Sequence, residues 1–126
     1  MHPFRAAIEA RDIDAAIALL ADDVEFRSPI VYAPYQGRDS VGELIRGVAR
    51  VFKNFRYVRE IGAESGRNHA LVFSARVGDK EVEGCDLIRC HEDGSIAELV
   101  VMVRPLSSAL ALVQQMHGQI SIDSRT

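Results

Sequence analysis

One acidic residue lies inside an apolar segment and is the first candidate for chemistry. Asp86 interrupts the segment 85–88, whose alternation is typical of a β-strand. On such a strand Asp86 shares a face with Gly84, Ile88 and Cys90. A carboxylate on an apolar face is costly when it is unpaired, so its pKa should rise. The neutral acid could then donate a hydrogen bond to a ligand carbonyl, and Asp86 is the candidate catalytic residue.

A structural role is the alternative for Asp86, with its carboxylate bonded to a backbone amide or to an arginine such as Arg104. Arg104 ends an apolar segment beside Pro105. Its guanidinium could clamp an anionic ligand through two parallel hydrogen bonds at a pocket mouth. It could equally face solvent, as most arginines do. Both interpretations stay open for both residues.

Histidines and cysteines form no recognisable ligand set in the sequence. The four histidines are His2, His69, His91 and His117. None is paired with another at i+2 or i+4, and we expect all of them at the surface. The two cysteines, Cys85 and Cys90, are five positions apart and so point to opposite faces of a strand, as reduced, partly buried thiols. With no glycine loop to cradle phosphate, the sequence predicts no metal and no cofactor.

Size and charge restrict the class of protein. The 126 residues fit one domain, and 48% hydrophobic residues suffice for a core without disulfides or metal. The net charge is −3 and basic residues are scattered among acidic ones, which argues against nucleic-acid binding. No segment has the pattern of a signal peptide or a membrane span. We therefore expect a cytoplasmic protein with no membrane partner.

Helical periodicity dominates the first half of the chain. The predicted helices cover residues 3–10, 13–23, 41–52 and 106–113. Asp39 and Ser40, followed by Glu43, give a capping-box signal before the third helix. Residues 1–118 are expected to form a single domain, and residues 119–126 a flexible tail.

Alternation with a period of two predicts the strands. They cover residues 24–28, 55–61, 69–77, 82–91 and 96–104. Turn sequences with hairpin chemistry separate the last four strands, at 66–68, 78–79 and 93–94. These strands should form an antiparallel meander, and the segregation of helices from strands predicts an α+β fold.

Four motifs, in this order and spacing, resemble the NTF2-like superfamily, which includes the SnoaL-like polyketide cyclases and the ketosteroid isomerases. The motifs are Phe4–Asp14, Leu19–Val24, Gly37–Asp39, and Asp86–Arg89 followed by Asp93–Ile96. The resemblance covers nearly the whole chain. It implies an NTF2-like cone, in which a curved antiparallel sheet and N-terminal helices enclose an apolar pocket, with a further C-terminal helix.

The ketosteroid isomerases use an Asp base, a Tyr donor and a protonated Asp. The resemblance places Ser28 at the base position, Phe4 at the tyrosine position and Asp86 at the position of the protonated acid. A serine without an activating base cannot remove a carbon-bound proton, and a phenylalanine cannot donate a hydrogen bond. We therefore do not expect a standard ketosteroid isomerase.

The resemblance also places Ser28, Tyr32 and Tyr35 at or after the strand that borders the pocket. Their hydroxyls could orient a ligand, although loop packing explains the tyrosines equally well. Apolar side chains such as Phe52 and Met102 are expected in the core or the pocket wall. The candidate ligand-binding residues are Ser28, Tyr32, Tyr35, Phe52, Met102 and Arg104.

Three functions fit these observations. The first is a cofactor-independent isomerase, cyclase or hydratase that acts on a small apolar molecule through Asp86. A second is a non-catalytic binding protein for a hydrophobic metabolite, which the missing base and tyrosine favour. The third is a dimerisation module, because sheets of this family often pair through their outer face. We expect a small hydrophobic molecule as a partner, and a homodimer.

Overall fold

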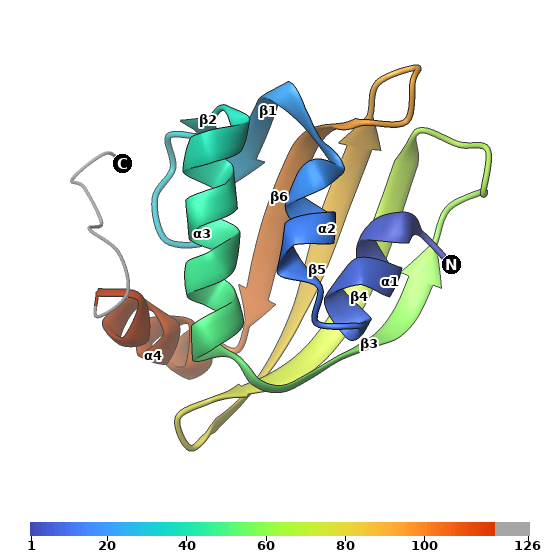
Figure 1. Ribbon diagram of the computed structural model, residues 1–126. Coiled ribbons are helices and arrows are strands. Elements are labelled where there is room, and N and C mark those ends of the chain that lie inside the picture. The colour runs from blue at the N-terminus through green and yellow to red at the C-terminus, as the bar shows by residue number, and fades with distance from the viewer. Residues whose placement is uncertain (118–126) are drawn as a thin grey trace.

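One curved, open sheet forms the frame of the protein (Figure 1). The structure is a computed structural model that describes residues 1–117; the tail predicted over 119–126 lies outside the described residues. Its strands are β1 (Leu20–Arg27), β2 (Tyr35–Gln36), β3 (Lys53–Ile61), β4 (Asn68–Val77), β5 (Lys80–Cys90) and β6 (Ile96–Arg104). They lie in the order β2-β1-β6-β5-β4-β3. The predicted antiparallel meander of the last four strands is confirmed.

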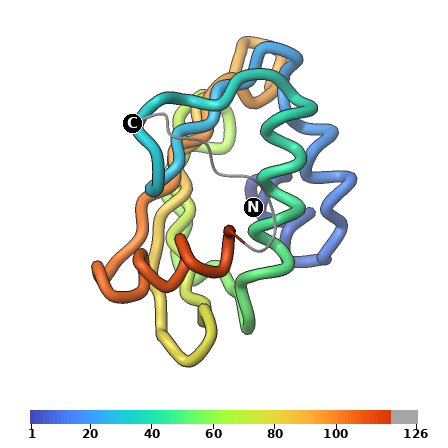
Figure 2. The backbone as a smooth tube through the Cα atoms, turned by 90° about the vertical axis from the view of Figure 1, so that its left-hand side faces the viewer, coloured from blue at the N-terminus to red at the C-terminus, as the bar shows by residue number. Residues whose placement is uncertain are grey.

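Within residues 1–117, the helices cover one face of this sheet and none of them lies on the other (Figure 2). They are α1 (Pro3–Glu9), α2 (Ile13–Ala18), α3 (Arg38–Val51) and α4 (Leu106–His117). The long helix α3 packs on β1, and α4 packs across β4, β5 and β6 at the end where the meander turns into it. The α+β class and the cone-like arrangement expected from the sequence are confirmed.

The first strand is longer than the alternation predicts. It begins at Leu20, so α2 ends at Ala18 and not near residue 23. Leu20 is fully buried and pairs with Ile96 of β6 in a parallel arrangement. This parallel pairing joins β1 to the meander, and the sequence gives no local signal for it, because the two strands are far apart in the chain.

Two local expectations between β1 and α3 are wrong. The loop after Pro29 contains the short strand β2, whose Tyr35 pairs with Phe26. The capping box is not formed, because α3 begins at Arg38 with Gly37 at its N-cap and no side-chain cap. The Arg38 guanidinium instead donates to the carbonyl oxygen of Leu20 at 2.7 and 3.0 Å. The start of α3 is thus held by a long-range hydrogen bond from Arg38 to β1, and not by the predicted local capping box.

Alternation along β4 and β5 decides which side chains face the helices. Leu71, Phe73 and Ala75 of β4 are buried on the inner face. Asp86 and Ile88 of β5 lie on the same face, as the sequence predicts. Register shifts along β3 add local bending at the edge of the sheet. The inner face therefore becomes concave, and its residues line a hollow.

Candidate functional site

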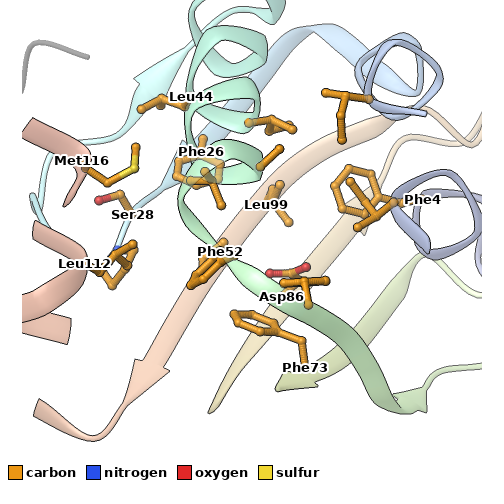
Figure 3. A pocket seen from close by; sticks show the side chains of 18 of the residues that line it. Phe4, Phe26, Ser28, Leu44, Phe52, Phe73, Asp86, Leu99, Leu112 and Met116 are labelled. Carbon is orange, nitrogen blue, oxygen red and sulfur yellow. The ribbon is translucent and has the colours of Figure 1, made fainter. Parts of the chain in front are cut away.

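A cavity of about 310 Å³ lies between the concave face of the sheet and the helices (Figure 3). Its walls are contributed by α1, α3 and α4 on one side and by strands of the sheet on the other. Labelled examples are Phe4, Phe26, Leu44, Phe52, Phe73, Leu99, Leu112 and Met116. The volume is in the range of small-molecule sites, and the wall is largely hydrocarbon.

Four aromatic rings form one wall of this cavity. Phe55 stacks on Phe73 with ring centroids 4.7 Å apart, and Tyr57 meets Phe55 edge-on at 5.0 Å. Phe52 completes the group at 5.5 Å from Phe73. Gly84 makes room for this arrangement, because a Cβ at that position would lie 2.2 Å from the Cζ of Phe73. The rings offer a flat, apolar surface to a ligand.

Asp86 and Tyr57 form the buried polar pair of the cavity. The Tyr57 hydroxyl donates a hydrogen bond of 2.8 Å to Oδ2 of Asp86. Asp86 is 7% exposed and Tyr57 is 6% exposed. Both residues line the cavity, and the carboxyl group of Asp86 projects from β5 into it (Figure 3). The ion pair between Asp86 and Arg104 that the sequence left open as an alternative is not formed, because Arg104 binds Glu83.

Burial controls the protonation of this pair. Loss of solvation raises the pKa of Asp86 to about 7, although the hydrogen bond from Tyr57 lowers it. Burial raises the pKa of Tyr57 far above its usual range, and the nearby charge of Asp86 raises it further. Tyr57 therefore stays a proton donor at neutral pH. Because Oδ2 accepts the Tyr57 bond, the proton of the neutral acid belongs on Oδ1.

An acid with a pKa near 7 populates both protonation states under physiological conditions. In the neutral state Asp86 can donate a hydrogen bond or a proton to an oxygen of a ligand. In the ionised state it can accept a proton. The site thus combines one titratable group, held in place by a tyrosine, with a hydrocarbon wall.

Four of the sequence-predicted residues come together at the cavity: Asp86, Ser28, Tyr35 and Phe52. The Ser28 Oγ accepts hydrogen bonds from the backbone amides of Ile30 at 2.8 Å and Val31 at 3.3 Å. These bonds hold the loop after β1 and leave the hydroxyl proton of Ser28 for another acceptor.

Three candidate ligand-binding residues lie outside the cavity. The loop residue Tyr32 is 82% exposed. Met102 pairs with Cys85 across β5 and β6, on the face opposite Asp86, and is 56% exposed. Arg104 lies at the exposed end of β6 and donates to Glu83 at 3.1 Å. Strand alternation turns the last two side chains away from the helices, so we leave all three out of the site.

Tyr57 is a candidate functional residue that the sequence analysis missed. Its segment alternates, and this places Tyr57 on the same side of the strand as Phe55. The contact with Asp86 depends on register, since Tyr57 pairs with Phe73, and Leu71 pairs with Asp86. A strand assignment alone could not supply these two registers.

The expectation of four surface histidines is also wrong. His69 is 8% exposed, because the side chain of this second residue of β4 lies on the inner face. It lies beside the half-buried His2, and the two rings have centroids 4.6 Å apart. Together with Cys90 they form a cluster outside the cavity. Residues 2, 69 and 90 have no common spacing, so no sequence motif could reveal it.

The family of the chain follows from comparison with known proteins. A family model described as the SnoaL-like domain matches residues 2–99, and the chain belongs to this family of the NTF2-like superfamily. A search of curated proteins gives no match. Among the described residues, no helix is long and apolar enough to cross a membrane.

Solved structures agree with this assignment. A steroid delta-isomerase from Pseudomonas aeruginosa is 41% identical, with a TM-score of 0.85, over 90% of this chain and 82% of that chain. An uncharacterised bacterial protein with a cystatin-like fold from Silicibacter pomeroyi is 36% identical, with a TM-score of 0.87, over 98% of this chain and 89% of that chain. An NTF2-like protein of unknown function from Cytophaga hutchinsonii shares the fold at 19% identity and a TM-score of 0.61, over 83% and 87% of the two chains.

Proposed function

We propose that this SnoaL-like protein is a cofactor-independent enzyme that acts on a small, largely apolar carbonyl compound. The chemistry is of the isomerase, cyclase or hydratase kind. Asp86 supplies a hydrogen bond or a proton to the carbonyl oxygen. The observation that carries the proposal is the buried Tyr57–Asp86 pair at the wall of an otherwise hydrocarbon cavity.

The physical basis is charge stabilisation away from water. When hydroxide or another base from the solvent removes the α-proton of a carbonyl compound, negative charge develops on the oxygen of the resulting enolate, and a donor in the cavity stabilises that charge more than water does. Neutral Asp86 is such a donor, and the bond from Tyr57 fixes the orientation of its carboxyl group. The aromatic wall of Phe52, Phe55 and Phe73 lines the same region with hydrocarbon and so offers no competing hydrogen bonds.

The similarity to the Pseudomonas aeruginosa protein, which is described as a steroid delta-isomerase, supports an apolar carbonyl compound as the ligand class. The standard steroid isomerase reaction is not part of the proposal. Ser28 stands where the resemblance places the base, and its Oγ already accepts two backbone hydrogen bonds. Phe4 stands at the tyrosine position and lines the cavity without a polar atom.

Exchange of α-protons tests the enzymatic proposal with a simple ketone. The protein is incubated with 2-tetralone in deuterated buffer, and loss of the α-proton signals is followed by NMR. We expect exchange faster than in buffer alone, and a loss of about 100-fold or more of the enzymatic rate in Asp86→Asn, as is typical for a general acid or base. Asp79→Asn, in the exposed β4–β5 turn, is the matched control and should exchange like the wild type. Equal rates in Asp86→Asn and the wild type would remove Asp86 from the mechanism.

A non-catalytic binding protein is the second candidate, and the lining of the cavity favours it. Among the described residues that line the cavity, the acidic ones are Asp86 and the exposed Glu9, and none is a histidine, lysine or cysteine. Apart from Asp86, these lining residues thus include no buried side chain of the kinds that usually take up a proton at neutral pH, because Tyr57 only donates. Binding of 2-naphthol, measured by its fluorescence, together with no acceleration of 2-tetralone exchange, would favour this candidate over the enzyme.

We also propose a homodimer formed through the uncovered face of the sheet. Cross-strand neighbours place Leu87 beside Val100, and Cys85 beside Met102, on this face. Leu87 is 38% exposed and Met102 is 56% exposed, so the central strands present a continuous apolar strip. Sedimentation velocity at micromolar concentration tests this, and a strict monomer would refute it. The cytoplasmic location expected from the sequence stays a prediction, which cell fractionation tests.

A further inference from the structure

Three metal-ligating side chains meet at the end of the sheet where α1 begins. His2 caps α1, His69 is the second residue of β4, and Cys90 ends β5. One ligand atom from each of the three lies within 4.8 Å of the others, and the His2 Nε2 is 4.0 Å from the Cys90 Sγ. None of the three lines the cavity that contains Asp86. The cluster is therefore separate from the site described above.

One buried ring nitrogen of His69 lacks a hydrogen-bond partner among the described residues. Its Nε2 lies 2.9 Å from the carbonyl oxygen of Gly66, which can only accept, so the ring proton sits on Nε2. Nδ1 is then a bare acceptor, and it has no hydrogen-bond partner among the described residues, although the residue is only 8% exposed. Gly62 keeps the space beside this atom open, because a Cβ there would lie 2.7 Å from Nδ1. A buried acceptor without a donor needs an explanation, and a cation supplies one.

We propose that His2, His69 and Cys90 bind a zinc ion. A thiolate with two imidazoles is a donor set that suits Zn²⁺ and disfavours Mg²⁺ and Ca²⁺. The bond from His69 Nε2 to a backbone carbonyl is the outer-shell contact that orients a ligating histidine. Three protein ligands leave the fourth tetrahedral position for water.

The spacing of the donors is close to what an ion requires. Points that lie within 4.8 Å of one another have a centre at most about 2.8 Å from each, whereas zinc takes bonds of about 2.0–2.3 Å. The sulfur must therefore move inward by at most about 0.5 Å, and each nitrogen by at most about 0.8 Å. His2 is half-buried at the N-cap of α1, where such a shift disturbs few neighbours, whereas Cys90 is packed in the core and is the more fixed of the two.

Metal binding has one visible cost in this structure. The His2 Nδ1 accepts the backbone N–H of Phe4 at 3.0 Å, so the proton of the neutral ring lies on Nε2. For Nε2 to bind zinc, that proton must move to Nδ1, and the cap of α1 is lost. The Cys90 thiol gives its proton to the buffer as the Zn–S bond forms. Glu60, which accepts the backbone N–H of His2 at 3.0 Å, keeps the residue near the cluster.

Cobalt titration tests the site directly. Protein without a histidine tag is treated with chelator, and Co²⁺ is added as a spectroscopic substitute for Zn²⁺. We expect a thiolate-to-cobalt charge-transfer band in the wild type and no such band in Cys90→Ser. His69→Gln should lower the affinity for Co²⁺ by more than the roughly 10- to 100-fold that the loss of an outer-shell partner costs. The matched controls are Cys85→Ser, on the opposite face of β5, and His91→Gln, whose ring contacts Asp23, and both should keep the band.

Thiol protection tests the same site without altering it. In the Cys85→Ser variant Cys90 is the remaining cysteine, and we expect Zn²⁺ to slow its alkylation by iodoacetamide at least about tenfold, whereas Mg²⁺ should not. Circular dichroism of each variant shows that the fold is kept. An unchanged alkylation rate with Zn²⁺, or a charge-transfer band that persists in Cys90→Ser, would overturn the proposal.

Discussion

The Tyr57 hydroxyl reaches across β4 to donate a 2.8 Å hydrogen bond to Asp86, so residues from two non-adjacent strands share one proton-bearing site. Strand β4 separates β3 from β5, and the bond is possible because the sheet is concave on this face. A flat sheet would hold the two side chains farther apart. The proposed chemistry therefore depends on the curvature of the sheet, which brings Tyr57 close to Asp86.

The stability of the protein should fall as the pH rises through the titration of Asp86. The pKa of Asp86 is raised from 3.8 to about 7, so the folded state binds a proton that the unfolded state releases between these values. The contribution of Asp86 to the free energy of unfolding is therefore complete below about pH 4 and decreases as the pH rises to about 7. The total decrease is at most about 4 kcal/mol. Asp86→Asn should remove this dependence and be more stable than the wild type at pH 8.

Urea unfolding at pH 5 and pH 8, followed by circular dichroism, measures this difference. Other titrating groups contribute alike to wild type and variant, so their effects cancel in the comparison. Asp79→Asn makes the same chemical change at an exposed turn and should follow the wild type. Identical pH dependence in Asp86→Asn and the wild type would show that Asp86 is not the buried acid that we describe.

Removal of the Tyr57 hydroxyl should raise the pKa of Asp86 further. The hydrogen bond from Tyr57 lowers that pKa, and Tyr57→Phe deletes it while the ring stays in place. Above the pKa the variant would hold a buried carboxylate that has lost this donor, which should cost about 1–3 kcal/mol. Carbon-13 NMR of the aspartate carboxyl groups measures the pKa. Tyr32→Phe, at an 82% exposed position, should leave the titration unchanged, and a fall of the pKa in Tyr57→Phe would contradict the proposed role.

Gly84→Ala should distort the aromatic wall of the cavity. The added Cβ would lie 2.2 Å from the Cζ of Phe73 and 2.8 Å from the carbonyl oxygen of Met102, so the ring must move. We expect a loss of about 1–3 kcal/mol, as for other overpacked cores, measured by urea unfolding. Phe73→Leu removes the nearest ring atoms, so Gly84→Ala should cost less in that background. Strict additivity of the two changes would show that the contact is not the cause.

A charge on the uncovered face of the sheet should separate the proposed dimer. Leu87 lies between Ala70 and Val100 on the outer face. In the proposed dimer, Leu87→Lys places one positive charge from each protomer at an apolar interface. We expect a shift from dimer to monomer in sedimentation velocity, with unfolding free energy changed by no more than about 0.5 kcal/mol in the monomer. Leu110→Lys, at a 56% exposed position on α4, should remain a dimer. A Leu87→Lys dimer as tight as the wild type would exclude this face.

Local patterns predicted most of the fold. Alternation located the last four strands to within a few residues, and turn sequences such as Gly78-Asp79 and Asp93-Gly94 predicted the meander that the structure shows. The same alternation placed Asp86 correctly on the buried face. The boundary between α2 and β1 was wrong, because Leu20 continues the helical period and yet is held in a strand by its pairing with Ile96.

Predicting the site was harder, because a site depends on which strands are neighbours. Arg104 and Met102 carry suitable side chains, but the register of β6 turns them to the outer face. The partner of Asp86 is instead Tyr57, which the fold brings in from β3.

The sequence by itself determined the kinds of elements, their order and the buried position of one acid, because these depend on the periodicity of nearby residues. Tertiary structure decided which distant groups meet: Tyr57 with Asp86 in the cavity, and His2 with His69 and Cys90 outside it. The reason is physical. Hydrophobic periods of two and 3.6 residues are local properties, whereas strand register and sheet curvature are settled only when all the strands pack together.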